Sequence, residues 1–301
     1  MSERVCAVVV TYNRKHLLAD CLRHLLLQQR RPEEILIVDN ASTDGTAELV
    51  RAEFPELTLL ELPANVGGSG GFHAGMQWAH ARKFDWLWLM DDDANAAPDC
   101  LAKLLAVSAD ADVVVPLQQD KLGRFYGVTS WESARGKDVT ADVVAGRLPE
   151  TGAYLFAFVG PLISRRMVDE VGLPNKDFFI WFDDLEYALR IEGRNGRVRI
   201  VREAVMSHDM GGALAPARFL WRKSFRATPP PWKTYYGTRN PLFFMIEQRR
   251  PARELMSYLL HQQRGYLADL AYGPQRWQRF RMRTKGIIDG LFGRLGRRVT
   301  P

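Results

Sequence analysis

Short apolar runs alternate with helical patterns along the N-terminal part of the chain. The first four runs are Val5–Val10, Ile35–Val38, Leu57–Leu62 and Trp86–Met90. Each run is too short for a helix and is typical of a strand buried on both faces. Between them, apolar residues recur at intervals of three and four, as on the buried face of a helix. This alternation predicts a doubly wound, mostly parallel α/β sheet with right-handed crossovers.

Polar residues follow the carboxyl end of each predicted strand. They are Thr11, Tyr12, Asn13 and Arg14 after the first, Asp39 after the second, Asn65 to Gly71 after the third, and Asp91 to Asp93 after the fourth. Ligands of open α/β sheets bind outside the carboxyl ends of the strands, and a cluster of carboxylates there suits a divalent cation and its phosphates. We therefore expect Asp91 to Asp93 to form a metal site for a nucleotide diphosphate. The triplet alone leaves open a solvated turn that caps the helix beginning near Pro98.

Two of these segments allow more than one interpretation. The glycines from Gly67 to Gly71 can let the backbone approach a phosphate, but a dinucleotide-binding fingerprint requires them after the first strand, not the third. A nicotinamide or flavin dehydrogenase is therefore disfavoured, and a flexible turn is the alternative. Asp39 can accept hydrogen bonds from a base imide or a ribose hydroxyl, and an exposed turn aspartate is the alternative.

A second group of candidate residues lies further along the chain. The aromatic run Phe178–Phe182 predicts a strand that leads into Asp183 and Asp184 at the start of a helix. Two adjacent carboxylates at such a junction point in different directions, so one can face a reacting centre while the other contacts an acceptor. Trp181 offers a flat face for a sugar, unless it belongs to the core. His208 follows another apolar run and can complete a coordination shell begun by the aspartates, unless it is structural.

Composition narrows the environment in which the protein works. The three cysteines are widely spaced and form no CxxC pair, so we expect buried free thiols in a reducing cytoplasm. The N-terminus lacks the pattern of a signal peptide, and no stretch approaches the ~20 apolar residues of a membrane span.

Positive charge is concentrated near the C-terminus. The formal net charge is +6, yet residues 249–301 contain twelve Lys and Arg against three acidic residues, so the preceding body is slightly acidic. Such a tail predicts an anionic partner, above all a membrane surface. Packing on the body, or on a second subunit in a homo-oligomer, is the alternative. No nucleic acid is expected, because base-stacking aromatic residues are not interleaved with the basic ones.

The C-terminal part also predicts its own structure. Pro229–Pro231 is typical of a stiff extended spacer. The apolar runs Leu242–Ile246, Leu255–Leu260 and Tyr266–Tyr272 then predict helices with arginine on their outer faces. We therefore expect a main domain of residues 1–225 and a basic helical extension of residues 226–301.

The motifs are more specific together than separately. They are Val-Thr-Tyr-Asn-Arg at 10–14, Val-Asp-Asn-Ala-Ser-Thr-Asp-Gly-Thr at 38–46, Asn-Val-Gly-Gly-Ser-Gly-Gly at 65–71, Asp-Asp-Asp at 91–93 and Trp-Phe-Asp-Asp-Leu-Glu-Tyr at 181–187, followed by His208. In this order they resemble the family 2 glycosyltransferases of the GT-A fold, over about residues 4 to 210. The glycine motif and Tyr-Tyr-x-x-Arg-Asn at 235–240 are most similar to bacterial galactofuranosyl- and rhamnosyltransferases.

This resemblance implies a metal-dependent, inverting transfer from a nucleotide-diphosphate sugar by a GT-A catalytic domain. The donor-binding residues it implies are Thr11, Tyr12, Asn13, Arg14, Asp39, Asn65, Gly68, Gly70, Gly71, Asp91 and Asp92. Mn²⁺ or Mg²⁺ would be bound by Asp91, Asp93 and His208. Asp184 aligns with the general base, and Trp181 and Asp183 align with acceptor-binding positions. Many members carry Glu-Asp instead of Asp-Asp here, which leaves open which carboxylate is the base.

From the resemblance we expect a galactofuranosyltransferase that uses UDP-galactofuranose to extend a lipid-linked cell-envelope glycan. A rhamnosyltransferase that uses dTDP-L-rhamnose is the alternative, and an inactive sugar-nucleotide or glycan-binding module is an alternative of another class. The chemistry is consistent, because inversion needs one base and a metal can neutralise the departing diphosphate. With its basic tail, the enzyme is expected to be cytoplasmic and peripheral at the inner face of the bacterial plasma membrane.

Overall fold

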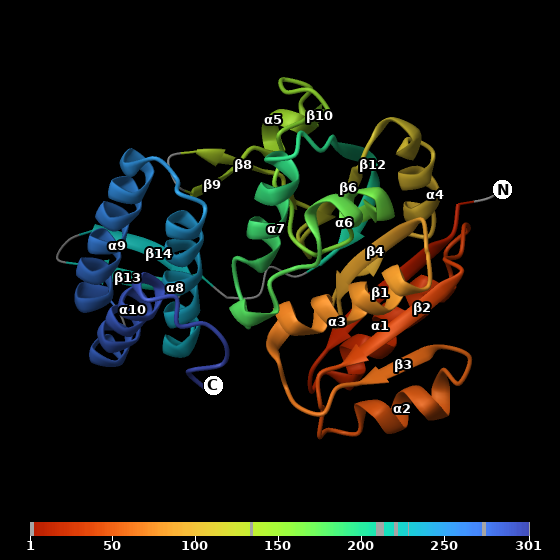
Figure 1. Ribbon diagram of the computed structural model, residues 1–301, viewed down its shortest axis with the longest axis horizontal. Helices are drawn as coiled ribbons and strands as arrows, with labels where there is room; N and C mark the ends of the chain where they lie inside the picture. The colour runs from red at the N-terminus through yellow and green to blue at the C-terminus, as the bar shows by residue number, and fades with distance from the viewer. Residues whose placement is uncertain are drawn as a thin grey trace.

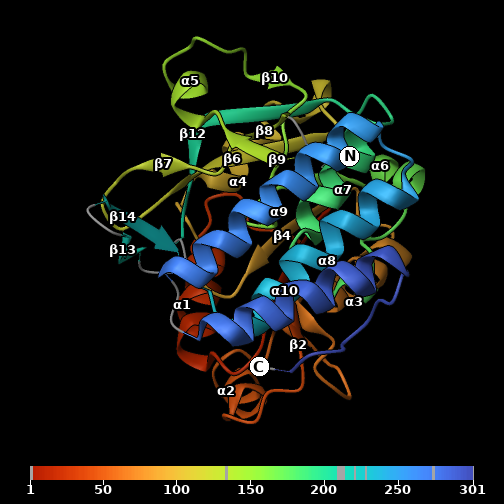
Figure 2. The same cartoon turned by 90° about the vertical axis from the view of Figure 1, so that its left-hand side faces the viewer.

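The computed structural model of the chain describes residues 3–132, 135–208, 214–219, 222–227, 229–272 and 275–300. A central sheet with helices on both faces makes up most of the molecule, and the C-terminal helices pack against one flank (Figure 1). Figure 2 shows these C-terminal helices in front of the sheet, where they contact one another.

The central sheet has the strand order β10-β12-β6-β11-β4-β1-β2-β3. Its main strands are β1 (Val5–Thr11), β2 (Glu34–Asp39), β3 (Thr58–Glu61), β4 (Trp86–Asp91), β6 (Val113–Gln119), β11 (Leu162–Ser164) and β12 (Val198–Ser207). Strand β11 is antiparallel to both β4 and β6 and joins two parallel groups, β4-β1-β2-β3 and β12-β6. The sheet is therefore mostly parallel, as predicted.

The remaining strands are short or lie outside the central sheet. Strands β5 (Asn95–Ala96), β7 (Phe125–Tyr126) and β10 (Thr151–Gly152) pair with β12, β6 and β12, respectively. Strands β8 (Thr129–Glu132) and β9 (Arg135–Asp138) form one separate two-stranded sheet, and β13 (Leu214–Phe219) and β14 (Arg222–Ala227) form another.

Helices cover both faces of the central sheet. Helices α1 (Lys15–Leu26), α2 (Thr46–Glu53) and α4 (Cys100–Leu105) pack on one face, and α3 (Gly67–Ala81), α6 (Arg165–Val171) and α7 (Asp183–Glu192) pack on the other. Helix α5 (Thr140–Val144) and the 3₁₀ turns η1 (Ser108–Asp110) and η2 (Lys176–Phe178) lie in the connections. Successive residues of a strand point to opposite faces, so strands covered on both sides are apolar throughout. This burial explains the continuous runs in the sequence.

The strand register gathers the polar strand ends at one edge of the sheet. Thr11 at the end of β1 is opposite Asp39 at the end of β2. On the other side of β1, Val10 is opposite Asp91 at the end of β4. The predicted α/β class is confirmed, and the segments that follow these strands meet at this edge.

Two local expectations are wrong. Phe178–Phe182 is not a strand, because η2 is followed by a loop in which Phe179, Trp181 and Phe182 have φ of 67°, 67° and 71°. The glycine motif is not a turn, because α3 already begins at Gly67. In both cases tertiary contacts override an expectation that was based only on the local sequence.

The basic C-terminal region contains α8 (Pro231–Glu247), α9 (Ala252–Tyr272) and α10 (Arg276–Leu291). Pro231 is the first residue of α8 and not part of an extended spacer, which suits proline because the first helical position needs no backbone N–H. Leu242, Phe244 and Met245 of α8 join the hydrophobic core beside α7. The division at residues 225 and 226 falls within β14 and remains a proposal.

Two compositional expectations can be compared with the structure. Cys6, Cys21 and Cys100 are buried and free, as predicted. Among the described residues, none of the helices combines the length and the apolar character that crossing a membrane requires.

Candidate active site

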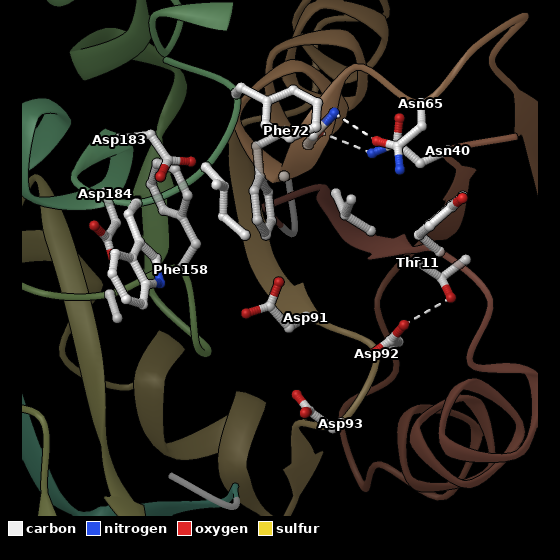
Figure 3. Close-up of a pocket in the computed structure, with 18 of the residues that line it drawn as sticks. Thr11, Asn40, Asn65, Phe72, Asp91, Asp92, Asp93, Phe158, Asp183 and Asp184 are labelled. Carbon is white, nitrogen blue, oxygen red and sulfur yellow. Dashed lines mark hydrogen bonds between the residues drawn. The ribbon is translucent and has the colours of Figure 1, made fainter. Parts of the chain in front are cut away.

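A cavity of about 530 Å³ lies at the edge where β1 and β4 end. Figure 3 shows Asp183 and Asp184 on one side of this cavity, facing the Asp91–Asp93 turn, with Thr11, Asn40 and Asn65 beyond that turn. The volume suits a small-molecule ligand. Segments that are distant in sequence therefore form one pocket.

Asp91, Asp93 and His208 form a candidate metal site. Each offers one ligand atom, and these atoms lie within 4.8 Å of one another. Asp91 ends β4, Asp93 follows in the turn, and His208 comes directly after β12. Two carboxylates and an imidazole are a suitable donor set for Mn²⁺ or Mg²⁺. The structure thus brings together the three residues predicted to bind a metal.

One atom of this group lacks a hydrogen-bond partner, and a metal ion could supply it. Asp93 Oδ1 is buried without a hydrogen bond among the described residues, and it lies 3.3 Å from His208 Nε2. The Tyr126 hydroxyl donates to the His208 carbonyl at 2.8 Å and lies 2.6 Å from His208 Nδ1. Tyr126 therefore engages Nδ1 and fixes the orientation of the ring, so that Nε2 is the ring nitrogen that faces Asp93. The residues therefore fit a cation between Nε2 and Oδ1.

The pKa values of these aspartates reflect how each is surrounded. Burial raises the pKa of Asp91 well above its usual range, and repulsion from Asp93 and Asp92 raises it further. Burial also raises the pKa of Asp93, but His208 and Arg14 outweigh it, so that the pKa is lowered. Asp91 is the carboxylate with uncompensated charge, and a bound cation would relieve that cost.

Asp92 has a different role in the structure. Its Oδ2 accepts a hydrogen bond from the Thr11 hydroxyl at 2.7 Å, and Arg14 lies 3.3 Å from its Oδ1. Arg14 also donates to Asp93 Oδ2 at 2.8 Å. Asp92 is almost completely buried, and burial raises its pKa to about 6. It therefore links the end of β1 to the end of β4.

The other predicted donor residues divide into those that line the cavity and those that support it. Thr11, Tyr12, Arg14, Asn65 and Gly68 line it, as do Asp91 and Asp92. Asn13, Asp39, Gly70 and Gly71 are not among the lining residues. Asn13 accepts from the Thr43 backbone at 2.7 Å, and Asp39 accepts from the Ser42 backbone at 3.1 Å. These two side chains therefore hold the β2–α2 connection.

Asn40 is a lining residue that the sequence interpretation missed, although it lies within the quoted motif at 38–46. Its amide donates to the Gly67 carbonyl at 2.8 Å, and its Oδ1 accepts from Val66 N at 3.0 Å. These bonds hold the start of α3 at the cavity. Gly67 is required there, because a Cβ would lie 1.9 Å from the Phe179 carbonyl oxygen and φ is +77°.

The loop before Asp183 is held by side chains of α8. Asn240 donates to the carbonyls of Phe178, Ile180 and Trp181 at 3.1, 3.0 and 2.8 Å. Arg239 donates to the Phe178 carbonyl at 2.9 Å, and both side chains are fully buried. Positive φ is costly for residues other than glycine, so the loop depends on these bonds. The Arg-Asn pair of the quoted motif at 235–240 therefore shapes the approach to the paired aspartates.

Asp183 and Asp184 begin α7 at the cavity wall. Burial raises the pKa of Asp183 to about 6. Burial, reinforced by repulsion from Asp183, raises the pKa of Asp184 to about 7. A half-buried carboxylate with a pKa near neutrality can accept a proton from a substrate. The geometry permits either carboxylate to face a ligand.

Helix α8 supplies two further lining residues that the sequence interpretation missed, Trp232 and Lys233. The predicted acceptor residue Trp181 also lines the cavity and is 37% exposed. Its ring packs against α8, where a Cβ on Gly237 would lie 2.7 Å from Trp181 Cε3. No local pattern marks Trp232 or Lys233, because only the docking of α8 brings them to the pocket.

Comparison with known proteins identifies the family. Residues 6–136 match the model of glycosyl transferase family 2. Galactofuranosyltransferase GlfT1 of Mycobacterium tuberculosis (strain CDC 1551 / Oshkosh) is 32% identical over 80% of this chain and 81% of its own length. The chain belongs to glycosyl transferase family 2. This family 2 glycosyltransferase is also 29% identical to N-acetylglucosaminyl-diphospho-decaprenol L-rhamnosyltransferase of the same organism, over 64% of this chain and 71% of that protein.

The fold agrees with that assignment. The mannosyltransferase PcManGT from Pyrobaculum calidifontis, solved in complex with GDP-Man and Mn²⁺, superposes with a TM-score of 0.57. The two chains are 17% identical, and the match covers 97% of this chain and 88% of the other. The predicted GT-A fold and family membership are both confirmed, and the protein is a glycosyltransferase.

Proposed function

We propose that this family 2 enzyme transfers galactofuranose from UDP-galactofuranose to a lipid-linked cell-envelope glycan, with inversion at the anomeric carbon. The observation that carries the proposal is that Asp184 and the Asp91–Asp93–His208 group line one cavity. A base and a metal-ligand group on facing walls are what an inverting transfer needs. The similarity to a protein named galactofuranosyltransferase supports the choice of sugar.

In this proposal Asp184 is the general base. Its carboxylate accepts the proton of the acceptor hydroxyl while the hydroxyl oxygen forms a bond to the anomeric carbon. On the opposite face, the bond between that carbon and the diphosphate oxygen breaks, and UDP leaves. The raised pKa of Asp184 suits this role, because a stronger base accepts the proton more readily. Asp183 and Trp181 are proposed to contact the acceptor sugar.

The donor is proposed to bind between the end of β1 and the start of α3. Thr11, Tyr12 and Asn65 would contact the nucleoside beside Asp39, and Gly68 leaves room for a phosphate because nothing lies within 4 Å of its Cβ position. Asp91, Asp93 and His208 would bind Mn²⁺ or Mg²⁺. When bound, this ion neutralises the departing diphosphate and orients it.

A second candidate is transfer of L-rhamnose from a dTDP-sugar. It is supported by the similarity to a rhamnosyltransferase whose name includes a diphospho-decaprenol acceptor. The two donors differ in the transferred sugar, in one methyl group of the base and in the ribose 2′-hydroxyl, so the same carboxylates would serve either reaction. Only the ligand preference distinguishes them.

Ligand-induced stabilisation tests both candidates. A thermal-shift screen would compare UDP, dTDP, GDP and their sugars, each with and without Mn²⁺, because a ligand that binds only the folded state raises its stability. We expect UDP to raise the unfolding temperature more than dTDP does, and only when Mn²⁺ is present. A larger rise with dTDP would favour the rhamnosyltransferase. No rise with any nucleotide would refute the donor site. Nuclear magnetic resonance of the product anomeric configuration then tests inversion.

We further propose that the extension docks on an anionic membrane. Helix α9 exposes Arg253, Met256, Leu260, Arg264 and Leu267 at intervals of three and four. Helix α10 exposes Trp277, Arg281 and Ile288, and Phe292, which directly follows this helix, is also exposed. Figure 2 shows the two helices on the same flank, where they contact each other, and we call these exposed residues the α9–α10 stripe. Apolar side chains mixed with arginine suit an interface with acidic lipids.

Vesicle sedimentation tests this docking. The wild type is expected to sediment with anionic vesicles at low salt and less at high salt, because ionic screening weakens the attraction. The double variant Leu260→Glu, Leu267→Glu should remain in the supernatant, because it places negative charge in the proposed membrane-binding stripe. Leu122→Glu is the matched control, because Leu122 is 75% exposed in a loop outside the stripe. Equal sedimentation of all three proteins would contradict the membrane role.

A further inference from the structure

Lys233 is a cation of the active-site cavity without a carboxylate partner. It lies in the first turn of α8, and no ion pair joins it to an acidic side chain within the described ranges. The other strong cation of the cavity, Arg14, is already paired with Asp92 and Asp93. Lys233 is therefore the lining cation that is available to a ligand.

Two tryptophan rings flank the Lys233 ammonium group. Its Nζ lies 5.8 Å from the ring centroid of Trp181 and 5.5 Å from that of Trp232. Both rings attract the cation and restrict the water around it. Burial lowers the pKa of Lys233, with a further contribution from the positive charge of Arg14. A desolvated ammonium group gains most from an anionic partner with oxygen acceptors.

The position of Lys233 indicates which anion it would meet. Asp91 lies within electrostatic reach across the cavity and opposes the lowering of the Lys233 pKa. The cavity wall carries five carboxylates, at positions 91, 92, 93, 183 and 184, so a lone anion would be repelled. A phosphorylated ligand at the metal-ligand group therefore needs a second positive contact on its other side. Lys233 lines the same cavity and is its lining cation without a carboxylate partner among the described residues.

We propose that Lys233 binds a diphosphate, with its ammonium group donating hydrogen bonds to non-bridging phosphate oxygens. The inference rests on the proposed function, which supplies two sources of this chemistry. One is the diphosphate of the nucleotide-sugar donor, and the other is the diphosphate of the lipid-linked acceptor. In either case a residue of the C-terminal extension, and not only the main domain, recognises the substrate.

Calorimetric titration with Mn²⁺ present provides the test. We would titrate UDP, UMP and inorganic pyrophosphate into the wild type, Lys233→Gln, Lys233→Arg and Lys176→Gln. The last variant removes an equal charge from η2, where Lys176 is exposed and does not line the cavity. All variants should share the wild-type unfolding midpoint, because both lysines lie outside the core. Lost charge-assisted hydrogen bonds should weaken a diphosphate contact about tenfold.

The outcomes separate the sources and the hypotheses. If the donor is the source, Lys233→Gln weakens UDP and pyrophosphate binding but not UMP binding, and Lys233→Arg restores much of it. If the acceptor is the source, Lys233→Gln binds UDP as the wild type does. Its KM then rises for a glycan acceptor carried on polyprenyl diphosphate but not for the same glycan carried on an octyl group. No change in either comparison, or an equal effect of Lys176→Gln, overturns the proposal. If the wild type binds pyrophosphate but no nucleotide, the proposed nucleotide-sugar donor is wrong. The Lys233 proposal is then tested by whether Lys233→Gln weakens pyrophosphate binding.

Discussion

The side-chain amide of Asn240 donates a hydrogen bond to the backbone carbonyl of Trp181 at 2.8 Å. This bond joins α8 to the loop that ends at Asp183, across a separation of 59 residues. The same amide nitrogen also reaches the carbonyls of Phe178 and Ile180. A buried carbonyl without a partner is costly, so Asn240 determines where this loop, and the carboxylates after it, can lie.

Replacing Asn240 tests that positioning role. Asn240→Ala should lower kcat at least about tenfold and cost on the order of 3 kcal/mol of stability, because several buried carbonyls lose their donor. Leu242→Ala is the matched control, since truncation of this fully buried α8 residue costs about 2–5 kcal/mol without touching the loop. Both would be assayed at a temperature where circular dichroism shows them folded. A similar loss of kcat in Leu242→Ala would mean that Asn240 acts only through stability.

The paired aspartates should respond differently to neutralisation. We expect Asp184→Asn to reduce turnover by about 10²–10⁴-fold, the usual contribution of a general base, while UDP still binds in the presence of Mn²⁺. Asp183→Asn should retain more turnover and mainly raise the KM for the acceptor. Initial rates and UDP titrations measure both effects. Near-normal turnover of Asp184→Asn, with collapse in Asp183→Asn, would assign the base to Asp183.

The pH dependence follows from the raised pKa of Asp184. A base must be deprotonated to act, so kcat should fall as the pH decreases through about 7, well above the ordinary range of an aspartate. Repulsion from Asp183 contributes to this shift. In Asp183→Asn the midpoint of the acid limb should therefore move to lower pH. The profile of kcat against pH measures it, and an unchanged midpoint in the variant would contradict the coupling.

Asp91 is predicted to cost the protein stability in the absence of metal. Because its pKa is raised in the folded state, its favourable contribution exists at low pH and is lost as the pH rises through that pKa. At pH 8 without metal, Asp91→Asn should gain about 1 kcal/mol, or about 2–4 °C in Tm. Mn²⁺ should raise the Tm of the wild type but not that of the variant.

Asp44 provides a control of opposite sign for the Asp91 variant. Its pKa is lowered, because hydrogen bonds from Thr46 and Lys15 outweigh the effect of burial. Asp44→Asn should therefore lose stability at pH 8, and this loss should disappear as the pH falls through the lowered pKa. Thermal unfolding of both variants across pH measures the two signs. A loss of stability in Asp91→Asn at pH 8 would show that the charge of Asp91 is compensated by other groups.

Much of the cavity wall formed by the strand ends could be predicted because its signals are local. The strands around Trp86–Met90 are apolar throughout, and polar side chains follow each of them directly. In a parallel sheet all such ends meet at one edge, so Asp91, Asp93 and Thr11 were brought near one another by strand order alone. The interpretation was less precise for Asp39, whose neighbour Asn40 lines the cavity instead. Which of two consecutive residues faces a ligand depends on backbone geometry after the strand has ended.

The amino-acid sequence by itself determined the α/β class, the family and the edge of the sheet that carries the carboxylates, because hydrophobic periodicity and short motifs act over a few neighbouring residues. Only the tertiary structure decided the conformation of the Phe178–Phe182 loop and the entry of Lys233 into the cavity. Both depend on the docking of α8, which supplies hydrogen bonds and packing from residues far along the chain. No local pattern encodes a contact between distant segments, since that contact exists only after the core has formed.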